Sequence, residues 1–217
     1  MKSANPMSEE SHRAKPVRGL ALCLASSFFG HYAHVGLLNR LHRAGVMPER
    51  IAGSSAGAIA GGLFAAGIRG RELEDLVMNF WFKRAFGDAG FLVRWPFVMC
   101  GIHGTGFLSG ERMKRFLRKR LGERRIEELR EPILEVAVSN LTKERPELVQ
   151  EGSLVDFMVA SFAIPCLFKT QRIEGCHYVD GGVVIEAPFG HLLDDPSVDT
   201  VAVPMIRHPR LGLGAPR

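Results

Sequence analysis

Residues 50–58 read Arg-Ile-Ala-Gly-Ser-Ser-Ala-Gly-Ala and are the most informative stretch of the chain. A short apolar run ends at Gly53 and helical spacing begins at Ala56, so Ser55 is predicted to lie on a sharp turn from a strand to a helix. Gly53 and Gly57 flank it in the pattern Gly-x-Ser-x-Gly, which relieves crowding at such a bend and exposes the serine hydroxyl. The pattern therefore indicates a nucleophilic serine. The structural alternative is a turn whose small residues serve only close packing.

Short apolar runs alternate with amphipathic stretches on both sides of this turn. Strands are expected at 20–24, 50–53, 133–138 and 200–204, and helices at 34–44, 56–66, 71–82, 109–121 and 155–162. This alternation predicts an α/β fold with a central, mostly parallel sheet flanked by helices. We expect a polar N-terminal tail over residues 1–18, one domain over 19–208 and a C-terminal tail over 209–217.

The composition narrows the class of protein. The chain has 217 residues, of which 46% are hydrophobic and 24% charged, so it has material for one domain with a core and is neither disordered nor collagen-like. A net charge of +5 permits contact with anionic surfaces, and no nucleic-acid-binding module accompanies it, so no nucleic-acid partner is expected. The four cysteines are Cys23, Cys100, Cys166 and Cys176, and they show no zinc-ligand spacing. They therefore predict buried, reduced thiols and a cytoplasmic location. No cluster of metal ligands is visible in the sequence, so neither a metal nor a cofactor is expected.

Two apolar stretches could be mistaken for membrane or export signals. Residues 19–30 resemble a signal-peptide core, and residues 51–68 carry no charge over eighteen positions, the length of a short spanning helix. Five of those eighteen residues are glycine, which makes the stretch weakly hydrophobic. We interpret the first stretch as a buried strand and the second as a turn followed by a tightly packed helix.

A nucleophilic serine needs a base, and the residues leave two arrangements open. A Ser-His-Asp triad in the order of the α/β-hydrolases would combine Ser55 with Asp180 and either His191 or His208. Only one strand, at 20–24, is expected before the strand that leads into Ser55, whereas that plan usually has several, which counts against it. In the second arrangement Asp180 acts on Ser55 directly, although Asp-Gly-Gly at 180–182 is also typical of a plain turn.

Four segments, in this order, resemble the patatin-like phospholipases. They are Ala-His-Val-Gly-Leu-Leu at 33–38, the serine turn at 51–58, Ala-Ser-Phe-Ala-Ile-Pro at 160–165 and Tyr-Val-Asp-Gly-Gly-Val-Val at 178–184. The resemblance implies a three-layer α/β fold and a lipid acyl hydrolase with a Ser-Asp dyad and a covalent acyl-enzyme. Ser55 would be the nucleophile and Asp180 its base, with Gly181 and Gly182 letting the backbone present the carboxylate.

The loop before the first expected helix departs from that family. The family carries a glycine-rich loop with a basic residue there, whereas residues 26–31 read Ser-Ser-Phe-Phe-Gly-His. We expect the backbone amides of Ser27, Phe28 and Ala56 to hold the oxyanion. The alternative is a weakened relative that binds lipid or membrane without turnover. His31 is expected to be a solvated loop histidine, or else to replace part of the missing charge, and His34 to make a structural hydrogen bond.

Two further stretches could contact a lipid surface. Residues 80–99 are rich in aromatic side chains, and residues 112–125 hold eight basic residues against one acid. An aromatic lid and a basic amphipathic helix would suit peripheral membrane contact. The plainer interpretations are an internal packed subdomain and a solvated helix face, and the sequence leaves both open.

Overall fold

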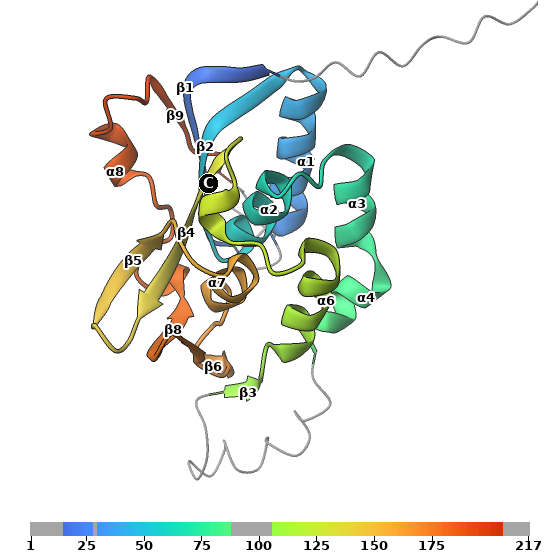
Figure 1. Ribbon diagram of the computed structural model, residues 1–217, viewed down its shortest axis with the longest axis vertical. Coiled ribbons are helices and arrows are strands. Elements are labelled where there is room, and N and C mark those ends of the chain that lie inside the picture. The colour runs from blue at the N-terminus through green and yellow to red at the C-terminus, as the bar shows by residue number, and fades with distance from the viewer. Residues whose placement is uncertain (1–14, 28–29, 88–105, 206–217) are drawn as a thin grey trace, which may run out of the picture.

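The structure is a computed structural model that describes residues 15–27, 30–87 and 106–205 (Figure 1). Its strands are β1 (Lys15–Leu24), β2 (Val46–Ser54), β3 (Gly106–Leu108), β4 (Ile133–Asn140), β5 (Arg145–Val149), β6 (Cys166–Phe168), β7 (Gln171–Ile173), β8 (Cys176–Asp180) and β9 (Thr200–Ala202). Its helices are α1 (His31–Arg43), α2 (Ala56–Ala65), α3 (Gly70–Met78), α4 (Phe80–Ala85), α6 (Glu111–Leu121), α7 (Leu154–Ser161) and α8 (Gly190–Leu193), with short 3-10 turns η1 (Ile126–Glu128) and η2 (Gly181–Val183). Because β1 begins at Lys15, the tail expected over 1–18 overlaps the first strand.

The main sheet is parallel at its centre and antiparallel at one side. Strand β9 pairs parallel with β1, β1 with β2 and β2 with β4. By contrast, β5 and β8 pair antiparallel with β4, and β7 pairs antiparallel with β8. The expected α/β class is confirmed. The antiparallel strands were not predicted, because they are short and β5 has no buried side chain to give it an apolar pattern.

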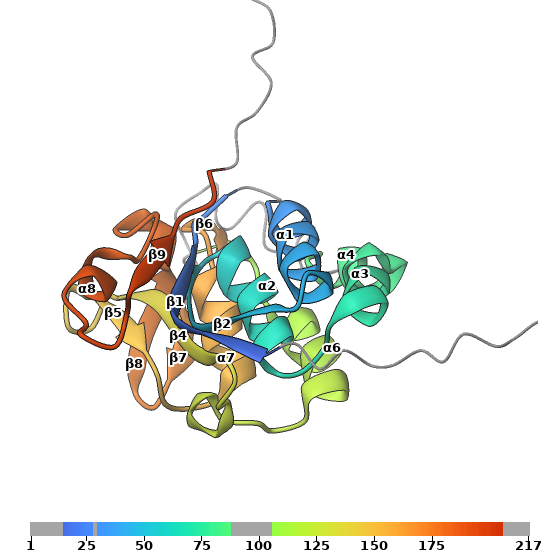
Figure 2. The same ribbon diagram turned by 90° about the horizontal axis from the view of Figure 1, so that it is seen from above.

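Helices cover both faces of this sheet (Figure 2). On one face, α1, α2 and α7 enclose the main core, and α3, α4 and α6 pack outside them. On the other face, α8 contributes Leu192 to a small cluster with Ala21 and Ala52 of the sheet. These layers match the expected three-layer arrangement.

One expected helix differs in the structure, and the uncharged stretch at 51–68 agrees with its interpretation. The helix expected over 71–82 is divided between α3 and α4 at Asn79, whose backbone is extended and whose side chain accepts a hydrogen bond from the Trp81 amide at 2.7 Å. Residues 51–68 form the end of β2 and the buried helix α2, as expected. Nowhere in 15–27, 30–87 or 106–205 is a helix both long and apolar enough to cross a bilayer.

Strand β4 brings two distant parts of the chain together. Residues 136–140 pair with β5 along one edge of β4. Because a strand has two edges, β2, paired with 133–137, and β8, paired with 138–140, must share the other edge. Ser54 therefore aligns with Ala137 and Asp180 with Val138, the next residue of β4. The ends of β2 and β8 meet at that point.

Candidate active site

Ser55 and Asp180 are in direct contact where β2 and β8 meet. The Ser55 hydroxyl donates a hydrogen bond to Asp180 Oδ2 at 2.7 Å. Only 6% of Ser55 and 4% of Asp180 is exposed. The structure thus brings together the two residues expected to be nucleophile and base, with no side chain between them.

Ser55 sits on the strand-to-helix turn in a backbone conformation that L-residues rarely adopt, with φ 52° and ψ −114°. A second serine supports this turn. The Ser161 hydroxyl accepts the Ser55 amide hydrogen at 2.9 Å and donates to the Ala137 carbonyl at 2.7 Å. Ser161 lies in the quoted segment 160–165, yet no role was assigned to it. The available signal is that Ser161 and Asp156 are the only polar residues of α7.

Asp180 is fixed by its own side chain and by its backbone. Its Oδ1 accepts the Gly182 amide at 2.7 Å, its amide donates to the Ala163 carbonyl at 3.0 Å, and its carbonyl accepts the Ser139 hydroxyl at 3.0 Å. Burial raises the pKa of Asp180, and the hydrogen bonds from Ser55 and Gly182 partly oppose that rise. A carboxylate in this environment is a better proton acceptor than an exposed aspartate.

The motif glycines allow the backbone to pack this closely. A Cβ atom on Gly57 would lie 2.0 Å from the Leu24 carbonyl oxygen, and one on Gly181 would lie 2.3 Å from the Ala137 carbonyl oxygen. Cβ atoms on Gly53 and Gly182 would meet the backbone nitrogen of Ala58 at 2.8 Å and the Ser26 hydroxyl oxygen at 2.3 Å. The close-packing role considered for the turn is therefore present, and Ser55 still lines the cavity described next.

A cavity of about 470 Å³ opens onto the Ser55–Asp180 pair. Much of its wall is apolar, with Ile59, Phe86, Leu108, Phe162, Leu167 and Phe168. Its polar lining comes from Ser26, Ser27 and His31 beside the pair itself, and among the described lining residues there is no lysine or arginine. Such a cavity suits an apolar chain attached to a group that reacts at Ser55.

Two of the three expected oxyanion donors line this cavity. Ala56 is the first residue of α2, so its amide has no carbonyl acceptor within the helix. Ser27 also lines the cavity, and its hydroxyl is buried without a hydrogen-bond partner in the part of the chain that the structure describes. The neighbouring Ser26 amide is already engaged by the Glu186 carbonyl at 2.7 Å. Phe28 lies outside the described residues.

The two histidines of this loop differ from each other. The expectation of a solvated His31 is wrong, because only 3% of it is exposed and its ring packs against Tyr32, Phe82 and Phe86. Burial lowers the pKa of His31 to about 4, so the ring is neutral at pH 7 and does not replace the missing positive charge. His34 places Nε2 at 2.9 Å from the Ala25 carbonyl, which confirms its structural hydrogen bond.

The histidines considered for a triad do not contact Asp180 in the described structure. His191 lies on α8, at the other face of the sheet, and its Nε2 bonds to the buried carboxylate of Glu135. His208 lies outside the described residues. The direct contact between Ser55 and Asp180 therefore favours the dyad arrangement over the triad.

The cysteines fit the sequence prediction only in part. Cys23, Cys166 and Cys176 are free thiols. Cys23 is buried, which raises the pKa of its thiol to about 12, but Cys166 is exposed, so the prediction of burial is wrong for Cys166. Cys100 lies outside the described residues. Among the residues with described positions, no group of three or more histidine, cysteine, aspartate or glutamate side chains could hold a metal ion.

Comparison with known proteins shows which family this chain belongs to. An uncharacterized NTE family protein of Mycobacterium tuberculosis is 30% identical over 85% of this chain and 48% of its own length, so the chain spans about half of that relative. Lysophospholipase nte1 of Aspergillus fumigatus is 27% identical over 81% of this chain and 11% of its own. The crystal structure of VipD from Legionella pneumophila shares the fold, with a TM-score of 0.56 and 15% identity over 88% of this chain and 49% of VipD. Residues 22–193 match the family described as Patatin-like phospholipase, and the chain belongs to that family.

Proposed function

We propose that this chain is a serine acyl hydrolase that cleaves acyl esters of lipids with Ser55 as nucleophile and Asp180 as base. The observation that carries the proposal is the 2.7 Å hydrogen bond from the Ser55 hydroxyl to a buried carboxylate. As Ser55 Oγ attacks the ester carbonyl carbon, its proton passes to Asp180. The resulting oxyanion is held by amides at the start of α2 and in the loop at 26–31.

The second half of the reaction uses the same pair. When the tetrahedral intermediate collapses, the leaving alcohol takes the proton from Asp180 and the acyl group stays on Ser55. Asp180 then accepts a proton from water, whose oxygen attacks the acyl-enzyme. Release of the fatty acid returns that proton to the Ser55 oxygen, and the enzyme is restored without a metal or cofactor.

The cavity favours a lipid with a single acyl chain as substrate. Its apolar wall would hold one chain, and its described lining offers no cation to bind a phosphate. The headgroup would then remain outside the cavity. A lysophospholipid meets this description, and the name of the Aspergillus relative, a lysophospholipase, agrees with it. We propose a cytoplasmic enzyme that works peripherally at membranes.

The loop at 26–31 supports a second candidate function, which is lipid binding without rapid turnover. The loop at 26–31 lacks the glycines and the basic residue of the family, and the Ser26 amide is engaged by Glu186. An oxyanion site weakened in this way would leave a protein that binds lipid without rapid turnover. Measured ester turnover separates the two candidates.

Labelling with a fluorophosphonate probe, which reacts with activated serines, is the first test. We expect wild type to label and Ser55→Ala to lose labelling. Ser54→Ala is the matched control, because Ser54 is adjacent and buried and donates to the Ile185 carbonyl at 3.1 Å; it should still label. No labelling of folded wild type in detergent would favour the binding protein, and loss of ester turnover in His191→Ala would favour the triad.

A further inference from the structure

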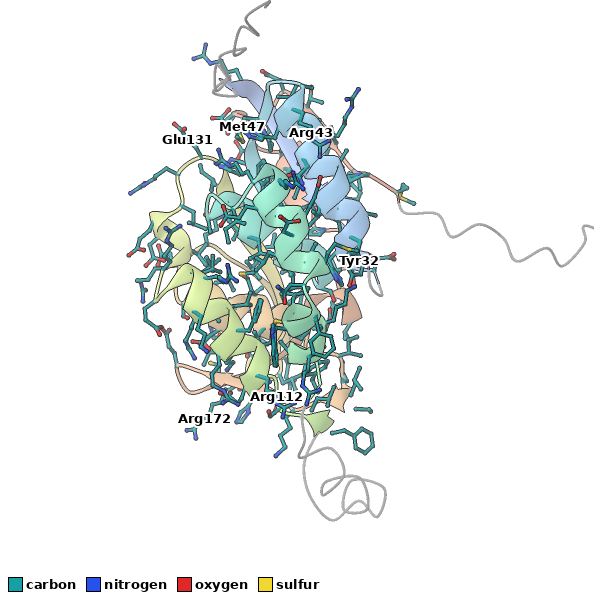
Figure 3. The ribbon with its side chains drawn as sticks, turned by 90° about the vertical axis from the view of Figure 1, so that its right-hand side faces the viewer. Tyr32, Arg43, Met47, Arg112, Glu131 and Arg172 are labelled. Carbon is teal, nitrogen blue, oxygen red and sulfur yellow. The ribbon has the colours of Figure 1, made fainter. Side chains whose placement is uncertain are left out.

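A second concavity lies outside the catalytic cavity, between α4 and α6. This basic groove has a volume of about 700 Å³. Five cationic side chains line it: Arg84, Arg112, Arg115, Lys119 and Arg120. Figure 3 views the side of the molecule where α6 runs past α4, with Arg112 labelled at the start of α6. Trp81 and Phe116 add aromatic surface to the same lining.

The cations of α6 fall into two groups. Lys114 and Arg118 turn inward and both form ion pairs with Asp156 of α7, at 3.2 Å and 2.8 Å. The other four line the groove together with Arg84 of α4. Within the described ranges none of these five groove cations forms an ion pair, and no aspartate or glutamate lines the groove. Two of the basic residues of 112–125, Lys114 and Arg118, therefore serve to hold α6 against α7. The groove cations remain available for an anionic ligand.

Apolar side chains project beside these cations. Phe80 and Trp81 are each 64% exposed and contact each other edge to face, and Met78 is 59% exposed. Exposed aromatic rings next to basic side chains are typical of surfaces that bind the interface of a membrane, where the rings lie among the headgroups and the cations meet phosphates. Isolated phosphate would use the cations but not the exposed rings.

We propose that the basic groove docks this chain on a bilayer that contains anionic phospholipids. Headgroup phosphates occupy the space between α4 and α6, and Phe80 and Trp81 enter the boundary between headgroups and acyl chains. The end of α4 joins the groove to the catalytic cavity: Ala85 lines the groove, Phe86 and Gly87 line the cavity, and Arg112 donates to the Gly87 carbonyl at 3.4 Å. Docking therefore holds the cavity beside the membrane.

Vesicle co-sedimentation tests the binding, and Ser55→Ala serves as the parent so that no turnover occurs. We expect tighter binding to vesicles of phosphatidylcholine mixed with phosphatidylglycerol than to phosphatidylcholine alone. In this parent, Arg115→Gln/Lys119→Gln should weaken that binding about tenfold or more, because each cation contributes near an anionic surface. Arg71→Gln/Arg172→Gln is the matched control, since it removes the same charge from exposed residues outside the groove.

Equal binding by the groove variant and the control variant would overturn the proposal. So would binding of a single-stranded oligonucleotide as tight as that of the anionic vesicles, which would assign the groove to nucleic acid, or groove-dependent binding of inorganic phosphate without vesicle binding. Phe80→Ser/Trp81→Ser should also weaken vesicle binding, whereas a pure phosphate site would not respond.

The catalytic consequence of docking rests on the proposed function and is tested separately. With Ser55 present, the groove variant should hydrolyse a water-soluble short-chain ester at the wild-type rate and a lysophospholipid embedded in anionic vesicles several-fold more slowly. An absence of ester turnover in every variant would refute the proposed hydrolase and leave the binding result intact. Equal turnover of the vesicle substrate by wild type and the groove variant would refute the coupling.

Discussion

The catalytic cavity and the basic groove adjoin at the end of α4, but the cavity favours the neutral forms of its ionisable side chains, whereas charged side chains line the groove. In the cavity, burial raises the pKa of Asp180 and lowers that of His31, so both side chains are biased toward their neutral forms. In the groove, five cationic side chains lie close together, and no acidic residue is among the lining residues that the structure describes. The difference indicates two uses of charged groups: burial shifts the pKa of the proposed base Asp180, whereas the solvated charges of the groove are left for contact with a partner.

The two regions also differ in how closely the backbone packs. Around Ser55 and Asp180, backbone atoms approach so closely that added Cβ atoms would overlap carbonyl oxygens. The groove is instead formed by side chains that project from two helices. Substitutions should therefore disrupt the fold in the first region and mainly change recognition in the second.

Gly57→Ala should have the largest effect and would test the steric part of this comparison. The new methyl group would lie 2.0 Å from the Leu24 carbonyl oxygen, so α2 would have to move away from β1. We expect a loss of more than about 4 kcal/mol in the free energy of unfolding, or no folded protein, measured by urea denaturation. Activity should disappear with the displaced turn.

Gly36→Ala is the control for that substitution. Gly36 lies within α1, and a Cβ atom there would meet no atom of the described residues within 4 Å. Alanine should therefore raise the free energy of unfolding by about 0.5–1 kcal/mol through its better helix propensity. If Gly57→Ala behaved like Gly36→Ala, the close approach of α2 to β1 would be incorrect.

Asp180→Asn separates activity from stability in the buried region. Without the carboxylate, turnover should fall by about 10²–10⁴-fold, the range for loss of a general base. Because the pKa of Asp180 is raised in the folded state, the wild-type protein loses stability as pH rises through that pKa. The variant lacks this loss. The thermal midpoint of the variant minus that of wild type should therefore increase as the pH is raised from acidic to neutral. Turnover near the wild-type value would refute the dyad.

Both residues of the proposed dyad can be recognised in the sequence, but their contact cannot. Local spacing identified the turn at 51–58 and the Asp-Gly-Gly segment, because each depends on residues close together in the chain. Their contact depends on β4, which aligns Ser54 with Ala137 and Asp180 with Val138. That register joins segments more than a hundred residues apart, and only the family resemblance pointed to it.

Burial was harder to predict than the motifs. His31 was expected in solvent, but it is covered by Phe82 and Phe86, which follow it by more than fifty residues. In the same way, the basic stretch at 112–125 gave no indication that Lys114 and Arg118 would turn inward to Asp156. A side chain's partner is set by tertiary packing, which local composition does not encode.

The buried His31 ring of the cavity should make the free energy of unfolding depend on pH. The pKa of His31 falls from 6.5 to about 4 on folding. At a pH between these two values the His31 ring is therefore protonated in the unfolded chain and neutral in the folded protein. Wild type should therefore lose about 2 kcal/mol through this group when the pH falls from about 7 to about 5. Urea denaturation of wild type and His31→Gln at both pH values measures it. The same pH-dependent loss in both proteins would contradict the buried, neutral ring.

The smallest effect on stability is expected in the basic groove. Arg115→Gln/Lys119→Gln removes two like charges spaced i and i+4 on α6. The free energy of unfolding should change by no more than about 0.5 kcal/mol, with a slight gain at low salt that disappears as salt screens the repulsion. Denaturation at low and high salt checks both statements.

Lys114→Gln, on the inward face of the same helix, provides the contrast. Lys114 is 7% exposed and its ammonium lies 3.2 Å from Asp156, so its loss should destabilise the protein by about 1–3 kcal/mol. If the groove variant were destabilised as strongly as Lys114→Gln, its cations would be holding the fold together. The division between partnered and available charge on α6, and with it the argument for an anionic surface, would then fail.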